Sequence, residues 1–344
     1  MLQHAHFYGC ENKTNKAEEI FIGNLRSYFF RRISEIIPVI LSIIVINFIL
    51  IQTAPGDPAV ALAGEWAELP EIENVRIKWG LDRPIHEQLV VYLSNIIRGD
   101  LGTSYHYQKP VIDIILERFP LTLLLVLTSM ILGITLGTIL GTFSASRFGR
   151  RIDHILSIAS IALYSMPVFW LGFIFIITLA LGQKLFPFAG FMSLSHLTGW
   201  DYVADVMWHM ALPSITLMLA LYIPVFVRIS RASVVEVMNE DYITTVRAAG
   251  LKERAIFFRH ALKNALVPVI QVAGMWLSSA FTGVIMTETV FSWPGMGMLM
   301  WSSLQQRDYP VLMGIFVISG VWVVVMLLIT DLICAAIDPR IMYE

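Results

Sequence analysis

Six long runs of apolar residues alternate with polar segments along this chain of 344 residues. None of the runs contains Asp, Glu, Lys, Arg or His. Each run has close to the roughly 20 residues that a helix needs to cross the hydrocarbon core of a bilayer. The pattern predicts an all-α membrane protein with six transmembrane helices, at Ile36–Gly56, Phe119–Ser146, Ile155–Gln183, Met210–Val227, Ala265–Thr287 and Val311–Thr330.

Proline and glycine modify the expected shape of two spans. The third run is longer than a bilayer requires and contains Pro167, which predicts a kink or a tilt. In the second run small residues recur every four positions, so this span is expected to pack closely on a neighbouring helix. These residues are Gly133, Gly137 and Gly141.

The distribution of basic residues predicts the orientation. Cytoplasmic segments near span ends are enriched in Lys and Arg. The N-terminus, the C-terminus and the segments 147–153 and 228–263 together carry 16 basic residues, against 8 in the remaining segments. Both termini are therefore expected in the cytoplasm, and the long polar segment 53–118 outside it.

Two external segments carry further signals. In the segment 53–118, Pro84 predicts a helix start and Gly99 a helix end. This segment is either a small cap that receives a substrate-delivering protein or a solvated loop with one packed helix. The apolar loop 287–297 is expected to fold back against protein, because irregular backbone is not tolerated in lipid. At its edge, Glu288 either meets a charged group of a substrate on its path or is solvated or paired within the protein.

The polar stretch 228–263 interrupts this hydrophobic chain with seven basic residues. Apolar positions spaced three or four residues apart from Val235 to Ala249 predict an amphipathic helix. Gly250 is expected to end that helix in the left-handed conformation, which glycine adopts without a Cβ clash. A second short helix with aromatic residues follows. Two short helices joined at a glycine, between apolar spans, predict a docking element outside the membrane.

This stretch resembles the cytoplasmic coupling loop of ABC importer permeases. The general form of that loop is Glu-Ala-Ala, three residues, Gly, nine residues, Ile-x-Leu-Pro. Gly250 and Leu262 match it, whereas Thr244-Thr245-Val246 stand in place of Glu-Ala-Ala, which argues against a generic sugar or amino-acid importer. The sequence from Asp241 to Val269 is instead similar to the oligopeptide/dipeptide/nickel branch. The resemblance covers about residues 28–340.

The resemblance implies a permease subunit that moves peptides by alternating access, with nickel complexes or oligosaccharides as alternative solutes. Its partners would be a homologous second permease, two ABC ATPase subunits that bind ATP and Mg, an extracytoplasmic solute-binding protein and the lipid bilayer of the inner or plasma membrane. The residues implied in coupling to the ATPases are Asp241, Arg247, Ala248, Ala249, Gly250, Leu251, Glu253, Ile256, Phe257, Phe258 and Arg259.

Three other kinds of protein fit the sequence less well. A secondary transporter usually places ionisable residues inside its spans, and an intramembrane Ser/His enzyme needs a histidine there; the six runs offer neither. The net charge of −2 gives no electrostatic case for a nucleic-acid partner. No phosphate-binding Gly-x-x-x-x-Gly-Lys-[Ser/Thr] motif occurs, so this chain is expected to be a non-catalytic subunit without a cofactor of its own.

The domain organisation follows from these segments. Residues 1–26 are predicted to be a polar cytoplasmic extension, residues 27–118 the first span with its external cap, and residues 119–340 a five-helix permease core with the coupling loop 228–263. No metal site is expected, because the eight histidines are scattered. The two cysteines, Cys10 and Cys334, are expected on the cytoplasmic side, where thiols stay reduced.

Overall fold

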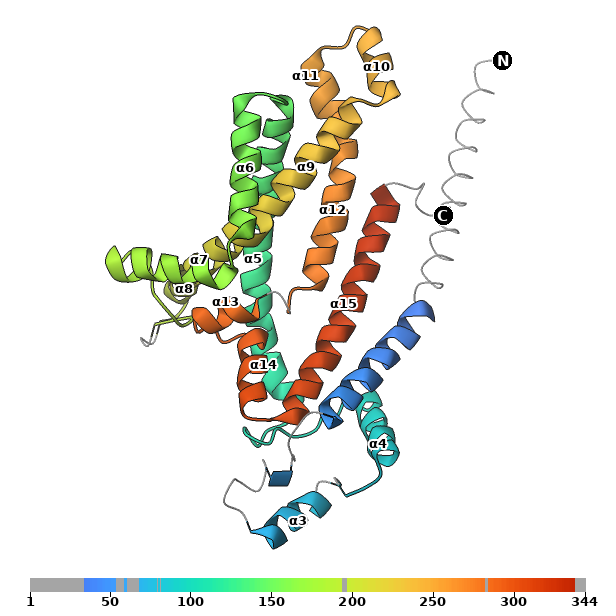
Figure 1. Ribbon diagram of the computed structural model, residues 1–344, viewed down its shortest axis with the longest axis vertical. Coiled ribbons are helices and arrows are strands. Elements are labelled where there is room, and N and C mark those ends of the chain that lie inside the picture. Colours follow the sequence, from blue (N-terminus) through green and yellow to red (C-terminus); the bar gives the residue numbers. More distant parts are fainter. Residues whose placement is uncertain are drawn as a thin grey trace.

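The computed structural model describes residues 34–53, 59–60, 68–78, 80, 82–193, 197–281 and 284–337. This part of the chain is built from helices, and its only bridge between extended residues is the isolated pair Thr103 and Pro110. Figure 1 shows the long helices running between two ends. One end carries α10 (Asp241–Ala248) and α11 (Glu253–Ala255), and the other carries α3 (Leu69–Lys78) and α4 (Ile85–Ile97). The predicted extension 1–26 lies outside the described residues.

Four described helices are long and apolar enough to cross a membrane. They are Ser34–Gln52, α5 (Val111–Ser146), the continuous helix Trp200–Met238, and Tyr309–Cys334 within α15 (Tyr309–Ile337). A bent pair of helices brings the number to five if the pair counts as one span. The prediction of an all-α membrane protein is confirmed, and the described residues support four or five of the six predicted spans.

The third apolar run forms the bent pair, α6 (Arg151–Ser165) and α7 with η1 (Val168–Gly182), which meet at 95°. Met166 between them is extended, with φ −79° and ψ 129°. The cause is Pro167, whose ring disfavours the helical conformation in the preceding residue. The predicted kink is confirmed, but the bend is far larger than a tilt and divides the run into two helices.

The fourth and fifth runs also differ from the prediction. The fourth is the middle of one long helix made of α8 (Trp200–Leu217), η2 (Met218–Tyr222) and α9 (Ile223–Met238). The fifth is not a single helix, because α12 (Leu262–Ser278) ends well before Thr287. The residues that follow form the short helices α13 (Ile285–Val290) and α14 (Met296–Gln305). The loop between them is packed inside the protein, where the side chains of Phe291 and Trp293 are fully buried.

The predicted close packing of the second span is confirmed, and its partner is the end of η2 with the first turns of α9. A Cβ atom added to Gly133 would lie 2.4 Å from Cβ of Tyr222, and one added to Gly141 would lie 2.4 Å from the carbonyl oxygen of Val227. Gly137 meets Phe226 in the same way, at 2.7 Å. Only glycine allows this approach, so α5 and α9 interlock along three turns without room for a side chain.

The described part of the polar segment 53–118 folds against the start of α15. Its helix α4 (Ile85–Ile97) begins after Pro84 and ends before Gly99, as predicted. The buried carboxylate of Asp308 accepts hydrogen bonds from the Ser104 hydroxyl and from the backbone N–H groups of Tyr105 (3.1 Å) and His106 (3.1 Å). Burial, with a contribution from Asp308, raises the pKa of Tyr105 to about 12. Asp308 thereby fixes the loop before α5 to the last long helix.

Candidate coupling surface

The polar stretch folds as a helical hairpin at one end of the molecule. Figure 1 shows α10 (Asp241–Ala248) and α11 (Glu253–Ala255) standing beyond the ends of α9 and α12. The π-helical segment η3 (Ile256–Ala261) continues α11 into α12. The predicted amphipathic helix from Val235 to Ala249 is in fact two helices, because α9 ends at Met238 and α10 starts at Asp241. We call residues 241–261 the coupling hairpin.

Gly250 makes the turn of the coupling hairpin as predicted. Its φ is +82°, and its N–H donates to the carbonyl oxygen of Arg247 at 3.0 Å. A Cβ atom added there would meet no atom within 4 Å. The need for glycine is therefore conformational and does not come from crowding.

The underside of the coupling hairpin is anchored to the spans by apolar packing. Ile243 and Ile256 are fully buried in one cluster with Val234 and Val237 of α9 and Ala265 of α12. Polar contacts close the same interface. The Tyr242 hydroxyl donates to the carbonyl oxygen of His260 (3.3 Å) and accepts from the amide of Asn264 (3.0 Å). The hairpin should therefore move together with the ends of α9 and α12.

The outer side of the coupling hairpin is open. Phe258 is 58% exposed and Leu251 is 40% exposed, so this side presents apolar surface that a partner could cover. Ile256, which the sequence grouped with the docking residues, faces the spans instead, and Phe257 is half-buried. The remaining residues implied in coupling are exposed: Asp241, Arg247, Ala248, Ala249, Gly250, Glu253 and Arg259.

A salt bridge crosses the turn of the hairpin. Nε of Arg247 lies 2.6 Å from Oε1 of Glu253, and both side chains are exposed. The hydrogen bond between them lowers the pKa of Glu253 and raises that of Arg247. Because the pair is exposed and screened by solvent, its main effect is to hold the two short helices in register about Gly250.

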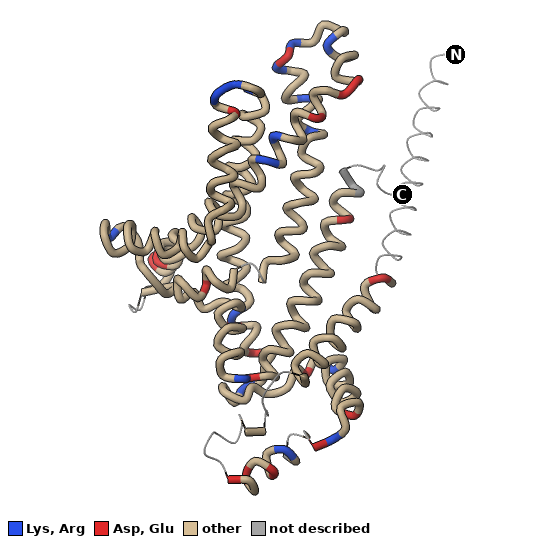
Figure 2. The backbone as a smooth tube through the Cα atoms, viewed as in Figure 1, with Lys and Arg blue, Asp and Glu red and all other residues tan. Residues whose placement is uncertain are grey.

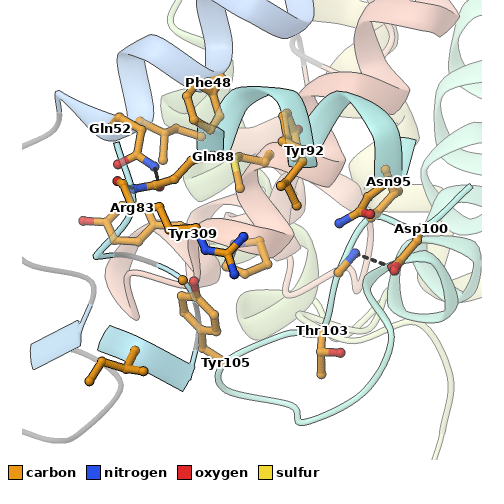
Figure 3. A pocket seen from close by; sticks show the side chains of 18 residues that line it. Phe48, Gln52, Arg83, Gln88, Tyr92, Asn95, Asp100, Thr103, Tyr105 and Tyr309 are labelled. Atoms are coloured by element: carbon orange, nitrogen blue, oxygen red, sulfur yellow. Dashed lines mark hydrogen bonds between the residues drawn. The ribbon is translucent and has the colours of Figure 1, made fainter. Parts of the chain in front are cut away.

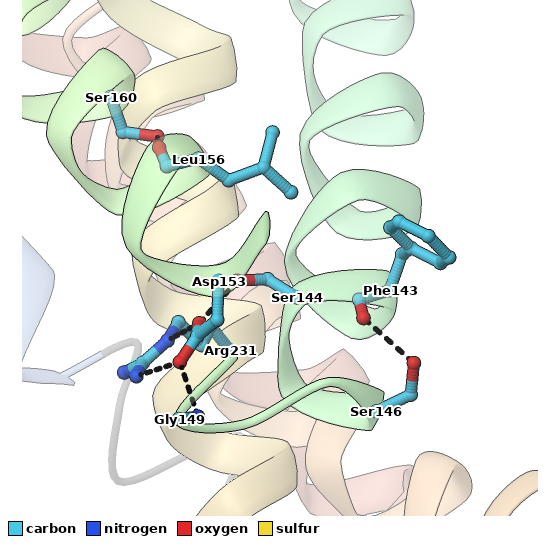
Figure 4. A network of polar contacts seen from close by, with 8 residues as sticks. All are labelled: Phe143, Ser144, Ser146, Gly149, Asp153, Leu156, Ser160 and Arg231. Atoms are coloured by element: carbon cyan, nitrogen blue, oxygen red, sulfur yellow. Dashed lines mark hydrogen bonds and ion pairs between the residues drawn. The ribbon is translucent and has the colours of Figure 1, made fainter. Parts of the chain in front are cut away.

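Below the hairpin, an ion pair between a buried carboxylate and a partly exposed arginine clamps three helices together (Figure 4). The carboxylate of Asp153 on α6 accepts two hydrogen bonds from Arg231 on α9, at 2.5 and 2.8 Å. It also accepts from the Ser144 hydroxyl at the end of α5 (2.6 Å) and from the N–H of Gly149 (3.0 Å). The Arg231 guanidinium stacks 5.1 Å above the ring of Phe148. Sequence reasoning missed Asp153, whose partner Arg231 lies 78 residues away.

Charged residues gather at this end of the molecule. Figure 2 shows Lys and Arg on the hairpin, on the turn between α5 and α6, and on α9, while the middle of the long helices is almost free of charge. The opposite end carries charges of both signs. This distribution leaves a central zone of uncharged helix between two polar ends, as expected for a chain that crosses a bilayer.

The opposite end holds a cavity of about 390 Å³ between the end of the helix Ser34–Gln52, α4 and the start of α15 (Figure 3). Its walls are mixed, with Tyr92 and Tyr309 beside Arg83 and Asp100. A hydrogen bond of 2.8 Å between the amides of Gln52 and Gln88 joins the helix to α4. The described residues contain no cluster of three or more His, Cys, Asp or Glu that could hold a metal ion.

Glu288 lies on neither of these surfaces. Its side chain is fully buried and hydrogen-bonded within the protein, which is the paired state of the two alternatives. That Glu288 contacts a substrate stays a prediction.

Comparison with known proteins extends over almost the whole chain. Residues 133–343 match the family described as binding-protein-dependent transport system inner membrane component, and residues 25–126 match the N-terminal region of the same membrane components. The oligopeptide transport system permease protein AppB of Bacillus subtilis (strain 168) is 38% identical over 93% of this chain and 100% of its own length.

Two further relatives from Escherichia coli are similar over the same extent. The dipeptide transport system permease protein DppB of strain K12 is 34% identical over 92% of this chain and 99% of its own length. The glutathione transport system permease protein GsiC of strain CFT073 is 35% identical over 92% of this chain and 99% of its own length. With two regional matches and full-length relatives, this chain belongs to the family of binding-protein-dependent transport system inner membrane components.

Proposed function

We propose that this chain is the membrane-spanning permease subunit of an ATP-driven importer of peptides. The observation that carries the proposal is the coupling hairpin, which is anchored to α9 and α12 on one side and presents exposed apolar residues on the other. Such a surface suits insertion into a groove of a partner, a common mode of helix recognition. The family of the chain supports an ATPase as that partner.

The complete particle would contain a second, homologous permease, two ATPase subunits that bind ATP and Mg, and an extracytoplasmic solute-binding protein. ATP-driven closure of the ATPases would move the hairpin, and the hairpin would rock the helices about a central path in alternating access. This chain takes no part in hydrolysis in the proposal, since it has no phosphate-binding loop.

A peptide is the proposed solute, ahead of a nickel complex or an oligosaccharide. The relatives that match over their full length are named for oligopeptides, dipeptides and glutathione, all of which are peptides. The test is uptake of a radiolabelled dipeptide by vesicles that hold the complete particle. Unlabelled peptides should compete with the label. Competition by nickel complexes or oligosaccharides alone would contradict the proposed solute.

The proposed topology has six spans with both termini in the cytoplasm, and α12 supplies the fifth span although it has only 17 residues. We expect a cysteine at exposed Lys252 to be protected from an impermeant thiol reagent in intact cells, and one at exposed Glu87 to be labelled. Cys10 and Cys334 are first replaced in both variants. Labelling of position 252 but not 87 would reverse the topology.

A further inference from the structure

Glu288 is a buried acid held by hydrogen bonds in place of an ion pair. It is 0% exposed, and no basic side chain lies within ion-pair distance of it in the part of the chain that the structure describes. Its carboxylate accepts from the Thr122 hydroxyl of α5 at 2.6 Å. It also accepts from the N–H groups of Gly297 (2.7 Å) and Met298 (3.0 Å) in the first turn of α14. The carboxylate therefore bridges α5 and the N-terminus of α14.

Thr122 completes the bridge from the side of α5. Its hydroxyl oxygen accepts from the N–H of Met296 at 2.7 Å while its proton goes to Glu288. Both side chains are fully buried. Since a buried polar group left without a partner is destabilising, the four hydrogen bonds are expected to form or break together.

The same region of α5 holds the loop that precedes α14. The indole N–H of Trp293 donates to the carbonyl oxygen of Leu121 at 3.0 Å. A Cβ atom added to Gly295 would lie 2.2 Å from the Glu288 carboxylate and 2.4 Å from the Thr122 hydroxyl. The segment 285–305, which we call the external segment, is thus seated on one turn of α5 with no space between them.

From this turn, α5 continues to Ser146 beside α9, and α9 leads to the coupling hairpin. Its glycines interlock with α9, and Asp153 clamps its far end to Arg231 of α9. Three residues beyond Arg231, Val234 packs beneath the hairpin. Because interlocked helices slide only by losing their packing, α5 and α9 should move as one body.

We propose that Glu288 is a positioning residue, which couples the external segment to this body through Thr122, so that movement of the coupling hairpin is delivered to the external side. This inference rests on the proposed function. It takes up the paired alternative for Glu288, because the carboxylate is fully buried and already accepts hydrogen bonds from three donors within the protein.

The test compares Thr122→Val with Thr135→Val in the complete particle. Both remove one hydroxyl from α5, but the Thr135 hydroxyl bonds only its own helix, at Ile131. Thr122→Val should lower the maximal rate of peptide uptake about tenfold, within the usual range of coupling free energies. The KM for peptide should stay within about twofold and ATP hydrolysis should continue, so more ATP is used per peptide. Thr122→Ser should restore transport, and Thr135→Val should behave as wild type.

The substitutions at Glu288 separate positioning from substrate binding. Glu288→Gln keeps the acceptor for α14 and should retain more transport than Glu288→Ala, again with an unchanged KM. A raised KM with a normal maximal rate would overturn the inference, and so would a Thr122→Val protein that transports as wild type. If the Glu288→Ala protein is lost from the membrane, the comparison of Thr122→Val with Thr135→Val tests the inference instead. Wild-type particles that move no peptide would instead overturn the proposed function.

Discussion

Gly250→Val should reduce ATP-driven uptake by roughly 5- to 30-fold while the chain still inserts in the membrane. The residue has φ +82°, and a β-branched side chain there costs about 1–2 kcal/mol, which corresponds to that factor in the population of the native turn. The packing of the spans does not depend on this turn, because a Cβ atom at Gly250 would touch nothing within 4 Å. The measurements are uptake, ATPase co-purification and stimulated hydrolysis at matched membrane levels.

Three further variants test whether the backbone is the cause. Gly250→Asn should be milder than Gly250→Ala, and Gly250→Ala milder than Gly250→Val, because asparagine enters the left-handed region most easily. Gly99→Val imposes similar strain at φ +79°, also without contacts, at the opposite end of the molecule from the coupling hairpin. It should leave ATPase co-purification normal. Full coupling in Gly250→Val would mean that force is not transmitted through this turn.

Arg231→Ala should destabilise the protein by about 3 kcal/mol, the lower end of what removing one partner of a buried ion pair costs, because Asp153 is buried but Arg231 is partly exposed. The change leaves the buried Asp153 carboxylate with two of its four hydrogen bonds, those from Ser144 and Gly149. The effect can be followed as resistance to heat and to protease in detergent. Asp153→Ala and the double variant complete a thermodynamic cycle, which isolates the energy of the pair.

Arg228→Ala is the matched control for this cycle. Arg228 lies one turn away from Arg231 on α9. Its side chain donates to the carbonyl oxygen of Pro224 (3.3 Å), and its guanidinium lies 4.7 Å from the centre of the Tyr164 ring. Within the described residues it forms no ion pair with a carboxylate. Arg228→Ala should therefore destabilise the protein much less than Arg231→Ala. Equal destabilisation by Arg228→Ala and Arg231→Ala would show that the ion pair contributes nothing specific.

The span-forming elements could be read from the sequence because they depend on composition alone. Charge-free runs of bilayer length, the proline break and the glycine repeat of α5 each follow from local chemistry. The 95° angle at Pro167 and the early end of α12 at Ser278 could not be read, since both depend on what each helix packs against. At both places the apolar residues continue along the sequence without interruption, so the apolar pattern alone marks neither the angle at Pro167 nor the end of α12.

The site was predictable where one residue determines the geometry. Gly250 alone predicts a turn, and the structure confirms that turn. The roles of Ile256 and Phe258 could not be separated, because two apolar residues two positions apart on a short helix look alike until the packing shows which is buried. The role of Asp153 and the partner of Glu288 could not be predicted for another reason. Their partners, Arg231 and Thr122, are 78 and 166 residues away, and only the fold brings them together.

The central claim is that this chain transmits the energy of ATP hydrolysis on other subunits to peptide movement. The most direct measurement follows ATP hydrolysis and peptide uptake in proteoliposomes, first with this chain alone and then with the second permease, the two ATPases and the peptide-loaded binding protein. We predict no hydrolysis by the chain alone, and hydrolysis with uptake only when all components are present. ATP turnover by the purified chain, or peptide uptake that persists when the chain is omitted, would contradict the account.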